Sequence, residues 1–154
     1  ANAIMLDIQE AVTATGYGNG YTIYDVEKDV FNPEGLSVEA ADTARIYSFL
    51  RECFILAKWS PECNVIALAL LIRLTTSVPD QVSLSKNNWA PLMLTALMIA
   101  QKIWDDIPLS NADFPKLWRR VCRNTKLMEE TLSVAQVNKM EVFFLNLLAQ
   151  VVEV

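Results

Sequence analysis

One long stretch, residues 87–104, reads NNWAPLMLTALMIAQKIW. Placed on a helix, its apolar residues occupy every side, and a helix of that kind is stable in water only when other helices surround it. Its nearly apolar part, 89–100, is shorter than the roughly 20 residues that a membrane span requires. We therefore expect the central helix of a globular domain and no membrane span.

Four further segments repeat their apolar residues at helical spacing, and after about residue 40 no stretch shows the strict alternation of a strand. They cover about 41–58, 61–75, 112–124 and a last segment that follows Ser133. Ser133 and the glutamine three residues later have the spacing of a capping box. The sequence predicts an all-α fold, a single domain of five helices around a buried third one.

The first 40 residues have a different pattern. Their apolar residues at 4, 8 and 12 suggest a short amphipathic helix, and TGYGNGYT follows with three glycines in five positions. This run lacks the G-x-G-x-x-G spacing and the lysine of phosphate-binding loops. We expect residues 1–40 to be an N-terminal extension with a flexible, Gly-containing linker, and 41–154 to be the domain.

The composition excludes several classes of function. A net charge of −5 disfavours nucleic-acid binding, and we expect the basic residues within 116–126 to form a solvated helix face. The absence of histidine rules out Ser-His-Asp triads and HExxH zinc sites. Three cysteines without a C-x-x-C pair offer no zinc spacing, so we expect no catalytic site, metal or cofactor.

The cysteines also bear on location. They are odd in number and lie among apolar residues, which favours free thiols in a reducing compartment. Residues 1–10 lack the basic start of a signal peptide. We expect an intracellular protein, cytoplasmic or nuclear.

The end of the apolar stretch, MIAQKIWDD, combines a cation, a tryptophan and two carboxylates. Lys102 lies in the last turn of the helix, where the helix dipole favours a positive charge. Asp105 and Asp106 are neighbours, and neighbours on a helix point about 100° apart, so they do not converge as a catalytic pair. Capping of a neighbouring helix or loop is the better interpretation for them, and packing is the better one for Trp104.

Three segments carry a family resemblance: SPECNVIALALLIRL, NNWAPLMLTALMIAQKIWDD and VNKMEVFFLNLL. They resemble the cyclin box, and in detail the cyclin Y and phosphate-pathway branch, over about residues 41–154. The resemblance implies a non-enzymatic subunit that binds a cyclin-dependent kinase of the PCTAIRE, PFTAIRE or phosphate-pathway type. It also implies that binding activates the kinase by positioning its αC helix.

Members of the family bind their kinase through one lysine and one glutamate. The motif resemblance assigns these positions to Lys102 and Glu141. If the two helices meet there, a donor and an acceptor stand side by side on a largely apolar edge. Apolar residues near the pair either add binding area or pack in the core. These apolar residues are Ile99, Ile103, Phe143 and Leu147. Secondary candidates for contact with the partner are Trp104, Asp105 and Asp106.

One departure from the family concerns a buried pair of an arginine and an acidic residue. The alignment places its two positions at Ser48 and Ile72, so both charges are missing together, which can be neutral for stability.

Two other functions remain open. One is an adaptor for transcription or scaffold proteins, and the other is an enzyme that uses Asp105, Asp106 or Asp113.

Overall fold

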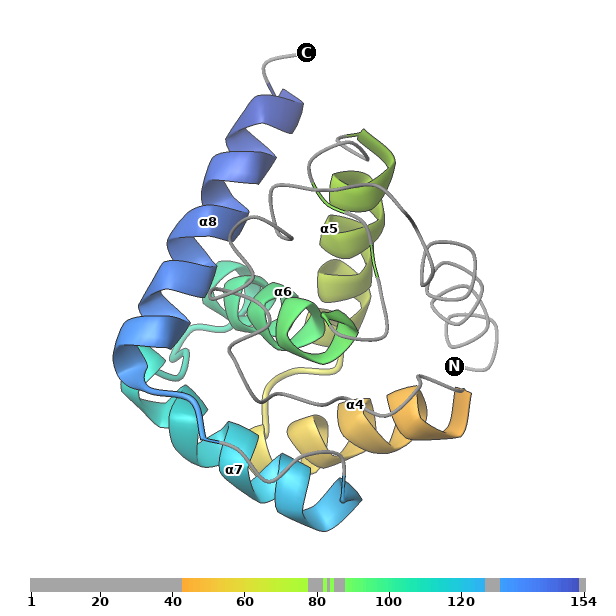
Figure 1. Ribbon diagram of the computed structural model, residues 1–154, viewed down its shortest axis with the longest axis vertical. Coiled ribbons are helices and arrows are strands. Elements are labelled where there is room, and N and C mark those ends of the chain that lie inside the picture. The colour runs from red at the N-terminus through yellow and green to blue at the C-terminus, as the bar shows by residue number, and fades with distance from the viewer. Residues whose placement is uncertain (1–42, 78–81, 83, 85–87, 127–130, 153–154) are drawn as a thin grey trace.

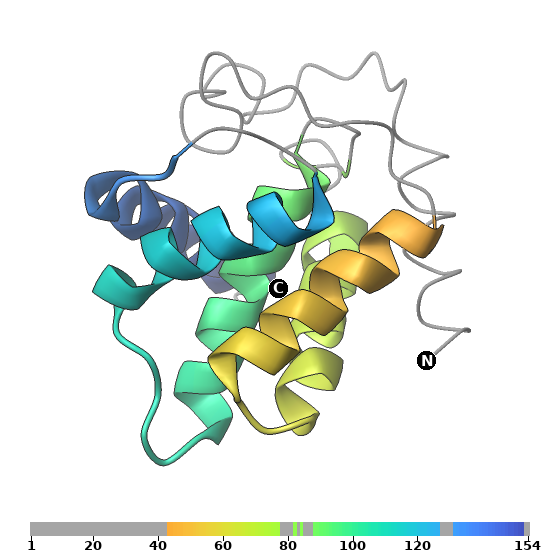
Figure 2. The ribbon, with the colours of Figure 1, turned by 90° about the horizontal axis from the view of Figure 1, so that it is seen from below.

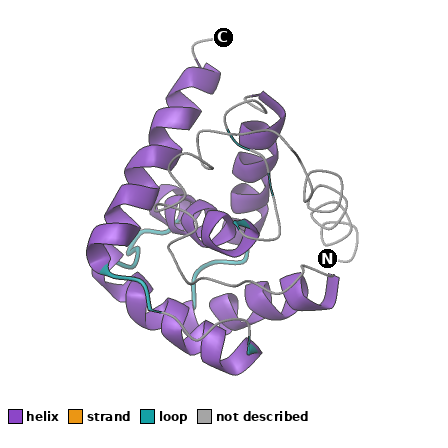
Figure 3. Cartoon of the chain, in the orientation of Figure 1, coloured by secondary structure: helices purple, strands orange, loops and turns teal. Residues whose placement is uncertain are grey.

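The computed structural model describes residues 43–77, 82, 84, 88–126 and 131–152. Every regular element in these residues is a helix (Figures 1 and 3). In chain order the elements are α4 (Thr43–Ala57), α5 (Glu62–Ser77), α6 (Trp89–Trp104), the 3-10 turn η1 (Asn111–Asp113), α7 (Phe114–Thr125) and α8 (Val134–Val152). The predicted all-α class with five α-helices is confirmed for this part of the chain. The predicted extension, residues 1–40, lies outside the described residues.

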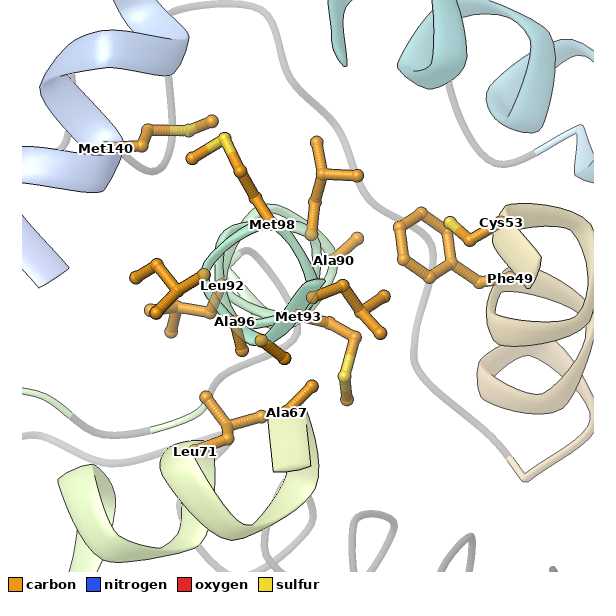
Figure 4. Packing of buried hydrophobic residues seen from close by; sticks show 14 of the residues in the cluster. Phe49, Cys53, Ala67, Leu71, Ala90, Leu92, Met93, Ala96, Met98 and Met140 are labelled. Atoms are coloured by element: carbon orange, nitrogen blue, oxygen red, sulfur yellow. The ribbon is translucent and has the colours of Figure 1, made fainter. Parts of the chain in front are cut away.

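Helix α6 lies at the centre, and α4, α5, α7 and α8 are arranged around it (Figures 1 and 2). Each of its residues from Trp89 to Gln101 is buried. Figure 4 looks along α6 and shows side chains of three other helices directed at it: Phe49 and Cys53 from α4, Ala67 and Leu71 from α5, and Met140 from α8. The expected central third helix is therefore present, and its apolar surface is covered on all sides.

An aromatic cluster joins three of these helices. The ring of Phe49 on α4 meets Trp89 on α6 at 5.5 Å between centroids and Trp118 on α7 at 6.0 Å, both edge to face. Such pairs add about 0.5–1.5 kcal/mol to the effect of burial alone. The cluster therefore fixes α4 and α7 against the start of α6.

The helix ends follow the local sequence closely. Ser133 and Gln136 form the predicted capping box, since the Ser133 N–H donates to Gln136 Oε1 and the Gln136 N–H donates to Ser133 Oγ. Helix α6 ends at Trp104 because Asp105 is extended, with ψ at 142°. Helix α7 is preceded by η1, in which Asp113 Oδ2 accepts the Ser110 N–H and hydroxyl.

The two positions at which a buried ion pair was expected to be missing are not buried. Ser48 is exposed on α4, and Ile72 on α5 is 43% exposed. Neither side chain occupies an interior site that a charged pair could have filled, so the replacement of a buried ion pair does not apply to these two positions.

Candidate functional site

Lys102 and Glu141 meet at one edge of the domain. Lys102 lies in the last turn of α6, and Glu141 lies in α8, 39 residues later. The Lys102 Nζ donates to Glu141 Oε2 at 2.5 Å, and the two side chains are 34% and 16% exposed. The expectation that the two helices bring these charges together is confirmed, whereas their contact with a partner stays a prediction.

Two asparagines complete this polar group. The Asn111 Oδ1, from η1, also accepts from Lys102 Nζ. Its Nδ2 donates to Glu141 Oε1 at 3.1 Å and to Asn138 Oδ1 at 2.8 Å. The lysine and the glutamate are thus held by a third element, and each keeps hydrogen-bonding capacity for another molecule.

Sequence reasoning missed both asparagines. Asn138 could have been found, because it lies three residues before Glu141 and therefore on the same face of α8. Asn111 belongs to a short turn with no periodicity, and only the tertiary fold brings it to the pair.

Several apolar side chains close in sequence to Lys102 or Glu141 are exposed. Ile103 is 63% exposed and Trp104 54%, and Ile107 just beyond α6 is 92% exposed. On α8, Val142 is 56% exposed and Leu145 45%. Isolated exposed apolar residues are normal, but five at the end of α6 and on α8 favour an interaction surface that includes these two elements.

The structure separates the four apolar candidates. Ile103 is exposed, and Phe143 is half-buried and packs against the core. Ile99 and Leu147 are only 4% and 2% exposed, so they belong to the core. In this conformation Ile99 and Leu147 pack in the interior and present no surface area to a partner.

The two neighbouring carboxylates have different roles. Asp105 Oδ2 accepts the Ser60 backbone N–H at 3.2 Å and lies 3.6 Å from the Cys63 Sγ donor. It therefore ties the end of α6 to the connection between α4 and α5, which is the capping role expected from the sequence. Asp106 is exposed, and no described residue pairs with it. Asp105 thus contributes to structure. Trp104, at the same helix end, was predicted to pack in the interior, but its side chain is 54% exposed.

All three cysteines are free and buried. Burial raises the pKa of the Cys122 thiol to about 12. Burial, with the charge and hydrogen bond of Asp105, raises the pKa of the Cys63 thiol to about 11. Burial and the nearby Cys122 and Glu52 raise the pKa of Cys53 as well. The thiols are therefore protonated at neutral pH and pack as small apolar groups.

The described part of the chain shows neither a metal site nor a membrane-spanning helix. It holds no group of three or more Cys, Asp or Glu side chains that could bind a metal ion. None of its helices has the length and hydropathy needed to cross a membrane.

Comparison with known proteins identifies the family. The model of the cyclin N-terminal domain matches residues 25–152, most of the chain. Cyclin-U4-1 of Arabidopsis thaliana is 35% identical over 75 residues, which are 49% of this chain and 37% of that protein. The matched region thus spans little more than a third of that relative. No solved structure matches significantly. Because the cyclin N-terminal domain matches most of its length, the chain belongs to the cyclin family, a family of regulatory rather than catalytic proteins.

Proposed function

We propose that this protein binds a cyclin-dependent kinase through the edge formed by Lys102 and Glu141 and activates it. The observation that carries the proposal is the ion pair between these two residues, which come from the central and the last helix of a cyclin domain. By the motif resemblance, kinases of the PCTAIRE, PFTAIRE or phosphate-pathway type are the first candidates. The unpaired thiols support an intracellular location, cytoplasmic or nuclear.

The chemistry of the pair suits recognition of a partner's backbone. Lys102 presents an ammonium with three donors, and Glu141 presents two acceptor oxygens. Asn111 fixes both side chains before binding, because it accepts from the lysine and donates to the glutamate. Less side-chain entropy is then lost when the partner binds.

The neighbouring apolar side chains supply area that the polar pair lacks. Ile103, Trp104 and Ile107 extend the edge from the α6 side, and Val142 and Leu145 extend it from α8. In such an interface the pre-positioned charged pair sets the register, and the apolar side chains buried on binding provide affinity.

Activation follows from differential affinity. A kinase whose αC helix moves between an inactive and an active position is shifted toward the active one only if the regulatory subunit binds that conformer more tightly. A rigid helical edge that pairs with αC in one position has this property. The proposed mechanism requires no chemistry from the cyclin domain itself.

The test uses the full chain and a panel of purified kinases of the three types. Lys102→Ala and Glu141→Ala are each expected to weaken binding of the partner kinase about 30-fold or more, as loss of a central hot-spot residue does. The circular dichroism spectrum should stay the same. Lys139→Ala is the matched control, because Lys139 is an exposed lysine on α8 that projects away from Glu141. It should bind as the unmodified chain does.

Two results would contradict the proposal. One is normal kinase binding by both alanine variants, which would place the contact on another surface. The other is no binding to any kinase together with capture of a transcription or scaffold protein, which would favour the adaptor function.

A further inference from the structure

Helix α7 carries a row of cations on its outward face. Phe114, Leu117, Trp118, Val121 and Cys122 are its buried residues. The exposed ones include four cations on α7 and a fifth directly after it, which together we call the α7 basic stripe: Lys116, Arg119, Arg120, Arg123 and Lys126. Their spacing of three or four residues puts them on one side of the helix over about 15 Å.

No ion pair with a described residue balances the charge of the stripe. Helix α7 contains no acidic residue, and none of the five cations has a hydrogen bond or ion pair with a side chain in the described part of the chain. Glu129 and Glu130 follow soon after in the sequence, but two carboxylates cannot neutralise five cations. Repulsion among like charges three and four residues apart destabilises an isolated helix, so an anionic partner for this face would lower its free energy.

The charge that matches the stripe is present in the same chain. Residues 1–42 contain eight carboxylates and one lysine, a net charge of −7, which leaves 43–154 with +2. Six of those carboxylates lie within 25–42, DVEKDVFNPEGLSVEAAD. The overall net charge of −5 therefore conceals an acidic segment followed by a slightly basic domain.

The helix that directly follows the acidic segment in the chain packs against α7. The acidic segment leads directly into α4 at Thr43, and α4 packs alongside α7 (Figure 2). The Asn124 Nδ2 donates to Glu52 Oε2 at 3.0 Å, so the C-terminal end of α7 lies near the middle of α4. Eighteen residues reach up to roughly 60 Å when extended, several times the length of the stripe.

We propose that the acidic segment 25–42 binds the α7 basic stripe of its own chain. Attachment through α4 gives this segment an effective concentration of the order of mM at the stripe, an advantage that no separate anionic partner has. The family match begins at residue 25 and so includes the segment, which supports its packing on the domain. The interaction is electrostatic, and salt weakens it.

The experiment places a nitroxide spin label at Ser37→Cys in the full chain and records amide signals of α7 by NMR. The native thiols are buried and protonated, so the introduced thiol reacts first. Amide signals of Arg119 to Arg123 are expected to lose at least about half their intensity at about 0.01 M salt and to recover at about 1 M, where the Debye length falls from about 30 to 3 Å.

Two charge variants make the test specific. Arg119→Glu/Arg120→Glu/Arg123→Glu should abolish the intensity loss. The control reverses three exposed cations outside α7, on or beside other helices, and should retain it: Lys58→Glu/Arg73→Glu/Lys139→Glu. Both variants change the net charge equally, so a difference between them reports the position of the charges.

Three outcomes would overturn the proposal. The first is the same loss of signal intensity in both variants. The second is no loss of intensity at low salt in the chain with unmodified charges, even if α7 then binds an added phosphorylated peptide. The third is a loss that appears equally when label and isotope are on separate chains, which would assign the contact to a second copy. None of these depends on kinase binding, so failure here leaves the proposed function standing.

Discussion

Replacing Asp105 by alanine tests whether the end of α6 is tied to the preceding helices as the structure shows. Asp105 Oδ2 accepts the Ser60 backbone N–H at 3.2 Å and faces the Cys63 thiol at 3.6 Å. The substitution removes the acceptor and leaves a part-buried backbone donor without a partner. We expect the free energy of unfolding to fall.

The magnitude follows from the kind of hydrogen bond. A bond to a charged group contributes about 1.5–3 kcal/mol, while a thiol is a weak donor and adds little. Since Asp105 is half-buried, water replaces part of the loss, so we expect about 2 kcal/mol. That corresponds to a decrease in Tm of about 5–10 °C for a domain of this size. Asp105→Asn keeps an acceptor oxygen and should cost about half as much.

Urea denaturation monitored by circular dichroism measures this loss, and Asp106→Ala supplies the control. Asp106 is adjacent and equally charged but exposed, so its loss should change stability by less than about 0.5 kcal/mol. A second readout is the Cys63 thiol, whose pKa Asp105 helps to raise. Removing Asp105 should lower that pKa and speed reaction with a thiol reagent. Equal destabilisation by the two alanine variants would refute the assignment.

Three other predictions concern stability. Ser133→Ala removes the capping hydroxyl at the start of α8 and should cost about 1 kcal/mol in urea denaturation. Phe144→Ala empties a fully buried site and should cost about 3–5 kcal/mol, whereas Leu145→Ala, 45% exposed, should cost less than about 1 kcal/mol by the same measurement. In the unfolded chain the thiols lose their protons near pH 9, whereas in the folded protein Cys63 and Cys122 keep theirs until pH about 11 and about 12. Stability is therefore lost as the pH rises, and the urea concentration at the unfolding midpoint should decrease from pH 9 to pH 11. The fall should be shallower in Cys63→Ala/Cys122→Ala.

Much of the fold could be predicted because each helix carries its own signal. The all-round apolar stretch identified α6 as central, and the capping box located the start of α8 to the residue. Lys102 and Glu141 were found through motif resemblance, since a cation at a helix end is by itself unremarkable. Ile99 and Leu147 show the limit of that approach, because a motif position does not reveal whether a side chain lies under the surface or on it.

Local sequence patterns were enough to predict the five α-helices of the described residues, their approximate ends and the helix that becomes the centre. These properties depend on periodicity and on hydrogen bonds between residues close in the chain. Tertiary structure decided which distant polar groups meet: Asn111 with Lys102 and Glu141, and Asp105 with Ser60. A hydrogen bond needs its two atoms within about 3.5 Å. These partners lie on or beside different elements, 9 to 45 residues apart in the chain, so the packing of those elements sets the distance.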